Sequence, residues 1–212
     1  MKAKILISLM VAALLWSCST TMQYTWKKEN FEGKKFNKIL VLAISKNMKS
    51  RTLMENSVVD LLKSEGINAT NALDVFTPVE NLKDLTEDEI GKRIAAGGYD
   101  GVLITSLLDT RTRDVQVNNM SYYPYMYGGY YGYGYRGFIY SNYNHLYSDQ
   151  YRQEKTYVLE TRLYDVNITD PKEAVVWAGQ SEMVDPSGVE SVSNSYSKQL
   201  VKALLESGAI SK

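Results

Sequence analysis

The sequence is poor in the residues from which most metal and catalytic sites are built. It has one histidine and one cysteine among 212 residues, whereas a structural zinc site needs about four nitrogen or sulfur ligands. The histidine, His145, stands alone in a tyrosine-rich segment, so no Ser–His–Asp order can be tested against it. No Gly-x-x-x-x-Gly-Lys phosphate loop is present either. These shortages predict no catalytic residue, no metal site and no cofactor, and therefore a protein that is not an enzyme.

The chain also lacks net charge. Its 24 basic and 24 acidic side chains cancel, whereas nucleic-acid binding needs a basic surface that displaces counterions from phosphate. Nucleic acid is therefore not an expected partner. With 44% hydrophobic residues the composition is that of a globular protein, and the length suits one domain with a long insertion.

The first eighteen residues indicate a secreted protein. Two lysines precede residues 5–15, an apolar run that is shorter than the ~20 residues of a membrane span but suits a secretory signal. The run ends in Leu15-Trp16-Ser17-Cys18, which resembles the lipobox of bacterial lipoproteins, although Trp16 is bulkier than the usual small residue. The alternative is an ordinary signal peptide that is cut elsewhere, with Cys18 incidental.

The lipobox resemblance implies a covalent lipid on Cys18. The thiol would receive a diacylglycerol, residues 1–17 would be removed as the signal peptide, and the new amino group would take a further acyl chain such as palmitate. Two or three acyl chains hold a protein durably, because each buried methylene contributes ~0.8 kcal/mol. Ser19 stands where an aspartate would retain a lipoprotein in the inner membrane, so the resemblance implies an outer-membrane protein that faces the periplasm. Residues 18–33 are then expected to form a tether.

Residues 34–212 are predicted to form a single α/β domain with a mixed sheet. Strand-like and helical patterns alternate over residues 38–44, 50–65, 67–72, 86–97 and 101–108, which indicates β-α-β-α-β with parallel strands. Residues 157–166 and the run from residue 174 predict an antiparallel hairpin, because a turn at Asp170-Pro171 separates them. A C-terminal helix follows and is expected to stop at Gly208.

The helices carry start signals and apolar stripes. Capping boxes are expected at Thr52–Glu55, Thr86–Glu89 and Ser187–Glu190. In the C-terminal helix the residues with helical spacing, which we expect to be buried, are Val189, Val192, Tyr196, Leu200 and Leu204.

Together these features resemble the small bacterial lipoproteins that carry an envelope domain of unknown function. Besides the lipobox, the residues that carry the likeness are Lys38–Ile44, Tyr99–Ile104, Leu163–Asp165, Val176–Ala178 and Leu204–Ile210. All of them are core or boundary elements. The resemblance therefore implies an α/β fold and an envelope location, but no chemical activity.

A tyrosine- and glycine-rich insertion at residues 119–151 is the one unusual feature. Residues 122–151 contain 12 of the 17 tyrosines, and their charged residues are Arg136 and Asp149. Three interpretations remain open: a low-complexity loop or extended hairpin, a surface for an envelope protein or for self-association, and a platform for stacking on cell-wall glycan. The candidate binding residues are Tyr122, Tyr123, Tyr125, Tyr127, Tyr130, Tyr131, Tyr133 and Tyr135.

Carboxylates supply the alternative to a binding role. Glu154, Glu160, Asp165 and Asp170 lie on or near the predicted hairpin and could in principle hydrolyse a glycan. However, Glu160 and Arg162 alternate along one strand, which is also typical of a solvated face. We therefore expect a lipid-anchored envelope protein with a non-catalytic role in binding or assembly, and keep a glycan-binding module or carboxylate-based glycan hydrolase as the alternative.

Overall fold

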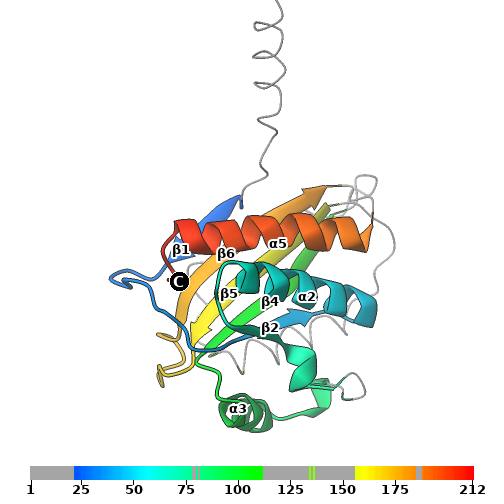
Figure 1. Ribbon diagram of the computed structural model, residues 1–212. Helices are drawn as coiled ribbons and strands as arrows, with labels where there is room; N and C mark the ends of the chain where they lie inside the picture. Colours follow the sequence, from blue (N-terminus) through cyan, green and yellow to red (C-terminus); the bar gives the residue numbers. More distant parts are fainter. Residues whose placement is uncertain are drawn as a thin grey trace, which may run out of the picture.

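The computed structural model describes residues 22–77, 80, 82–111, 134, 136, 156–184 and 188–212. Six strands form one sheet: β1 (Tyr24–Lys27), β2 (Ile39–Ile44), β3 (Ala69–Asn71), β4 (Gly101–Arg111), β5 (Thr156–Asp165) and β6 (Val175–Val184). The helices in the described part are α2 (Met48–Ser64), α3 (Glu87–Ala96) and α5 (Val189–Glu206), with short 3₁₀ turns η1 (Ala72–Asp74) and η2 (Leu82–Asp84) (Figure 1).

The strands lie in the order β1-β6-β5-β4-β2-β3. β2 pairs in parallel with β3 and with β4. The pairs β4–β5, β5–β6 and β6–β1 are antiparallel. Parallel pairs need a long connection, which α2 and α3 provide, and a short turn joins β5 to β6 as a hairpin. The predicted α/β fold with a mixed sheet is therefore confirmed.

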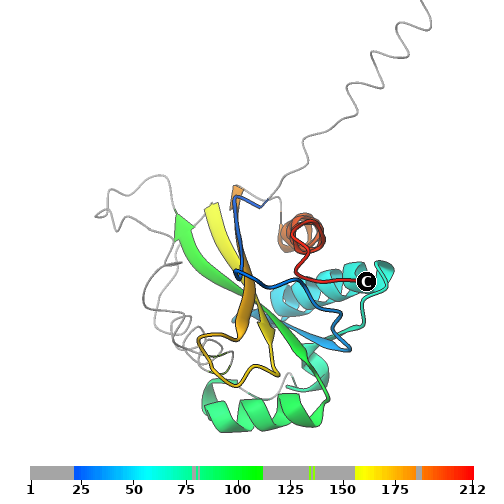
Figure 2. The same ribbon diagram turned by 90° about the vertical axis from the view of Figure 1, so that its left-hand side faces the viewer.

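The helices cover the two faces of the sheet unequally. α2 and α5 lie side by side across one face, and α3 packs against the other face near one end (Figure 2). Alternate residues of each strand point to opposite faces, so the sheet contributes to two cores. Val41, Leu103, Leu163 and Trp177 pack with α2 and α5, whereas Leu40, Leu42, Val102 and Ile104 pack with Ile90 and Ile94 of α3. None of the helices in the described residues is long and apolar enough to cross a bilayer.

The predicted stripe of α5 is largely correct. Tyr196, Leu200 and Leu204 are completely buried, and α5 ends before Gly208, which has φ +64°. Val189, however, is 41% exposed, so its predicted burial is wrong. It occupies the first position of the helix.

The predicted caps have mixed outcomes. Thr86 and Glu89 form the expected capping box at the start of α3. The box at Thr52–Glu55 is wrong, because α2 begins earlier and its cap is Asn47, whose side chain accepts from the Ser50 amide at 3.1 Å. The box at Ser187–Glu190 is also wrong: the cap of α5 is Gly188, which has no side chain to accept a hydrogen bond, and Ser187 lies outside the described residues.

The segment 18–33, expected to be a tether, contributes a strand to the sheet. β1 pairs with β6 from Tyr24 opposite Gln180 to Lys27 opposite Trp177. Its aromatic residues Tyr24 and Trp26 alternate with polar ones, but four residues are too short a pattern to identify a strand, and its partner β6 is distant in sequence. The folded part therefore begins by Met22, which is buried, and not at Lys34.

A polar cluster fastens the start of β2 to the start of β4. The Asp100 carboxylate accepts hydrogen bonds from the backbone amides of Asn37 and Lys38, each at 3.0 Å. Lys34 lies 3.9 Å from Asp100 and donates to Asp165 at 2.8 Å. Burial alone would raise the pKa of Asp100, but these amides and the Lys34 charge together hold it below its ordinary value of 3.8.

We predict that Asp100→Asn destabilises the fold by about 1.5–3 kcal/mol at pH 7, because the charged acceptor is lost. Since the folded pKa is lowered, the stabilisation by Asp100 is present above pH 3.8 and disappears as the pH falls through the folded pKa. Urea unfolding should therefore show a smaller difference between variant and native protein at pH 3 than at pH 7. Asp60→Asn, at an exposed position of α2, is the matched control. An equal loss at both pH values would contradict this role for Asp100.

Candidate functional site

A cavity of about 300 Å³ lies at the end of the sheet where α2 and α5 both begin. The parallel strand β2 ends here, at Ile44 opposite Ser106 of β4, and ligands of open α/β sheets bind outside the carboxyl ends of parallel strands. The residues that line the cavity are Ala43, Ile44, Ser45, Ser50, Met54, Thr105, Ser106, Leu107, Tyr157, Leu159, Gly188, Val189, Val192 and Ser193. We call it the α2–α5 cavity.

The lining is apolar and hydroxylic. Among the described residues that form it, none carries a charge at neutral pH. The Thr105 hydroxyl is engaged with the Thr161 hydroxyl at 2.7 Å, which in turn lies 2.7 Å from the Tyr196 hydroxyl. Complete burial raises the pKa of Tyr196, so this chain of hydroxyls is neutral. The lining therefore offers hydrogen bonds and apolar contact, without an acid or base.

Two serines of the lining have unsatisfied hydroxyls. Ser106 and Ser193 are each 1% exposed, and within the described structure neither Oγ has a hydrogen-bond partner. A buried polar group without a partner costs about 1–3 kcal/mol. Ser193 lies one turn after Val189, on the same face of α5, and both line the cavity together with Val192, so the first turns of α5 border it. A ligand with hydrogen-bonding atoms would satisfy the Ser193 hydroxyl. Ser106 lies opposite Ile44 and Glu160 in the sheet, so strand alternation points its side chain to the α3 face, and it borders the cavity through its backbone.

Sequence reasoning did not find this cavity. Its residues come from five elements, and the serines stand inside patterns that were interpreted as a buried strand and a helix stripe. Two signals were present: Ser106 interrupts the apolar run of residues 101–108, and Gly188 follows Asp185-Pro186-Ser187 at the start of a helix. Neither signal shows that Ser106 and Gly188 lie beside the same cavity.

The sequence-predicted site residues lie outside the described residues. This holds for Cys18 and for all eight candidate tyrosines of the insertion. Within residues 119–151 the structure describes Gly134 and Arg136. The Arg136 guanidinium lies 3.2 Å from Asp88 of α3 and rests on Gly91, where a Cβ would come within 2.1 Å of it. The insertion therefore contacts α3 at this point.

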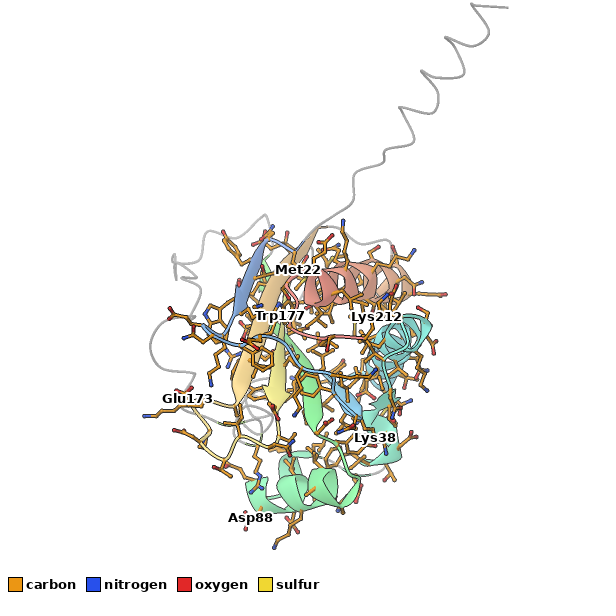
Figure 3. The ribbon with its side chains drawn as sticks, turned by 60° about the vertical axis from the view of Figure 1, so that its left-hand side comes forward. Met22, Lys38, Asp88, Glu173, Trp177 and Lys212 are labelled. Carbon is orange, nitrogen blue, oxygen red and sulfur yellow. The ribbon has the colours of Figure 1, made fainter. Side chains whose placement is uncertain are left out.

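The N-terminal chain is held close behind Cys18. Met22 and Trp177 both lie over Gly179 of β6, where a Cβ would be 2.7 Å from the Met22 methyl and 2.4 Å from the indole (Figure 3). Three residues lie between Cys18 and Met22, and the four peptide units that join their Cα atoms span at most about 14 Å.

The carboxylate candidates are used as structural groups. Glu160 and Arg162, expected on a solvated face, are 5% and 3% exposed, so that expectation is wrong. Glu160 accepts hydrogen bonds from Arg162 Nε and from Gln180 at 2.8 Å. Burial opposes the charge of Arg162, but the Glu160 carboxylate holds its pKa above the ordinary value. An alternating polar pattern cannot distinguish a solvated face from one that other parts of the chain cover.

The remaining carboxylates do not converge on Glu160. Asp165 accepts from Lys34, and Asp170 accepts from the Lys172 amide at 2.9 Å in the β5–β6 turn. Glu154 lies outside the described residues. The described residues contain no group of three or more His, Cys, Asp or Glu side chains that could hold a metal ion.

We predict that Glu160→Ala destabilises the fold by about 3–5 kcal/mol, because it leaves the Arg162 charge buried without its counter-ion. The matched control is Glu173→Ala, which removes the exposed partner of Lys28 and should cost less than about 1 kcal/mol. Urea unfolding of both variants measures the difference. Similar losses for the two variants would show that the buried pair has no special role.

Comparisons with known proteins give only distant likenesses. No protein-family model matches the chain, and no curated protein sequence does. Among solved structures, a DUF4136 family protein from Bacteroides thetaiotaomicron is 11% identical, with a TM-score of 0.42 over 89% of this chain and 97% of that chain. The PelC dodecamer from Paraburkholderia phytofirmans is 14% identical, with a TM-score of 0.41 over 88% and 95%. Lipoprotein GNA1162 from Neisseria meningitidis is 15% identical, with a TM-score of 0.36 over 80% and 96%.

Proposed function

We propose that this protein is a lipid-anchored, non-catalytic binding protein of the bacterial cell envelope, with the α2–α5 cavity as its binding site. The observation that carries the binding role is the lining of this cavity, which combines apolar side chains with the unsatisfied hydroxyl of Ser193. Small-molecule sites are concave and mostly apolar, with a few polar groups that orient the ligand. The cavity has this composition.

A non-catalytic role fits the position of the titratable groups. General acid–base chemistry needs a titratable side chain within hydrogen-bond reach of the reacting group. The described lining contributes none that is charged, and the Glu160 carboxylate is committed to Arg162 and Gln180 on the other face of the sheet. Binding is therefore the activity that the described residues support.

Anchoring through Cys18 rests on the lipobox. The apolar run of residues 5–15 and the single thiol that follows it suit lipid attachment, and we place the mature protein at the outer membrane, facing the periplasm. The buried Met22 supports a close approach of the domain to the bilayer, since only three residues lie between it and Cys18, which would carry the lipid.

The tyrosine-rich insertion supplies a second, independent surface in this proposal. Its eight candidate tyrosines offer aromatic area at low entropic cost, which suits a contact with an envelope protein or with another copy of the chain. Arg136 joins the insertion to α3, on the side of the molecule away from α2 and α5 (Figure 2). A partner held there would leave the cavity accessible.

The anchor is tested by Cys18→Ser. We expect this variant to leave the membrane fraction in flotation gradients, because the acyl chains that hold the protein are gone. Mass spectrometry of the native protein should show the lipid on the residue that becomes the N-terminus after residues 1–17 are removed. Ser19→Ala is the control and should float as the native protein does. A Cys18→Ser protein that still floats at its normal size would refute the lipid anchor.

The binding role is tested with octan-1-ol and the mature protein in lipid nanodiscs. Calorimetric titration, with empty nanodiscs as the blank, should show one saturable site per chain. Val189→Trp should abolish this binding, because Val189 lines the cavity and its 41% exposure leaves room for the ring at the rim. Met48→Trp, at an exposed first-turn position of α2 outside the lining, should bind normally. Equal binding by both variants, or no binding by the native protein, would show that the α2–α5 cavity is not the binding site.

A further inference from the structure

We infer that the ligand of the α2–α5 cavity is an unesterified medium-chain fatty acid, a carboxylate with an aliphatic tail of about eight carbons. The inference rests on the proposed binding role of the cavity and adds the class of its ligand. Three features of the described residues carry it: the size and apolar lining of the cavity, the donors at its polar end, and its position relative to the anchored N-terminus.

The body of the cavity fits an aliphatic chain. Ile44, Met54, Leu107, Leu159 and Val192 line it with branched or unbranched hydrocarbon. A volume of about 300 Å³ equals the liquid volume of about ten water molecules, which is close to the size of eight carbons and two oxygens. Apolar ligand surface would be buried there at roughly 25 cal/mol for each Å².

The polar end of the cavity offers donors and a partial positive charge. α5 is 18 residues long and begins at this cavity, and no side chain caps it at Gly188. The amides of a helix N-terminus attract anions. The unsatisfied hydroxyl of Ser193, which is 1% exposed and lines the cavity, is the independent indication, because it can donate to a carboxylate oxygen. Glu190, the acidic residue of the first turn, is exposed and does not line the cavity.

The cavity lies at the end of the sheet from which the N-terminal chain departs. β6 runs in the same direction as β4, and β1 runs opposite to β6, so β1 begins toward the end where β2 and β4 finish. From Tyr24, opposite Gln180, four further residues of β6 lead to that end at Val184. The chain from Met22 back to Cys18 can cover a similar length. A lipid on Cys18 therefore keeps this end near the bilayer, where fatty acids concentrate.

The experiment compares four probes with one tail on the mature protein in nanodiscs: octanoate, octan-1-ol, methyl octanoate and octylamine. Octanoate should bind at least about ten-fold more tightly than the alcohol, because a hydrogen bond to a charged group contributes more than one between neutral groups. Methyl octanoate represents an esterified lipid chain and should resemble the alcohol, whereas octylamine should bind most weakly. Ser193→Ala should weaken octanoate binding by about ten-fold and octan-1-ol binding by less than about three-fold. Ser191→Ala, an exposed neighbour on α5, is the matched control.

The outcomes separate the inference from the proposed function. If octan-1-ol or methyl octanoate binds as tightly as octanoate, or if Ser193→Ala does not reduce the preference for octanoate, the carboxylate inference is overturned while the binding role stands. If no probe binds, or if Val189→Trp binds all of them as the native protein does, the cavity is not the binding site and both fail. Selective octanoate binding that Ser193→Ala weakens and Val189→Trp abolishes supports both.

Discussion

The Glu55 carboxylate accepts a backbone hydrogen bond from β2 beyond the point where β3 pairs with it. β3 pairs with β2 only as far as Val41, after which the chain turns away into η1. Beyond that point the Ala43 amide donates to Glu55 Oε1 at 3.0 Å, and Arg51 Nε donates to the same oxygen at 2.8 Å. Burial raises the pKa of Glu55, and the Arg51 charge opposes this rise. This fully buried carboxylate joins the end of β2 to the first turns of α2, and it therefore holds one wall of the α2–α5 cavity in place.

The same residue shows why part of the fold could be predicted and part could not. Thr52 and Glu55 have the spacing of a capping box, but Arg51 and Glu55 have the spacing of an ion pair on one helix face, and the two patterns coincide in sequence. Which of the two patterns forms depends on whether the Glu55 side chain is buried, and burial is set by the tertiary packing. Strands and helices with long apolar patterns, such as β2, β4 and α5, were predictable because each pattern is local. β1 was not, because its partner β6 lies 150 residues away.

The candidate site also has parts that a local sequence pattern reveals and parts that only tertiary packing brings together. The run that resembles a lipobox is contiguous, so Cys18 could be singled out from sequence alone. The α2–α5 cavity depends on the starts of two helices, on residues of β2, β4 and β5, and on Ser193, which only the packing of α2 and α5 on one face of the sheet brings together. Glu160 and Arg162 show the opposite case, since their alternation is visible in sequence but their burial is not. Polar residues inside apolar runs are the sequence feature that these cases share.

The burial of Met22 over Gly179 limits where the domain can work. If Cys18 carries the proposed lipid, four peptide units, at most about 14 Å of chain, join its Cα to that of Met22, so the domain would stay close to the membrane surface that holds the lipid. A larger partner would then have to approach that surface to meet it.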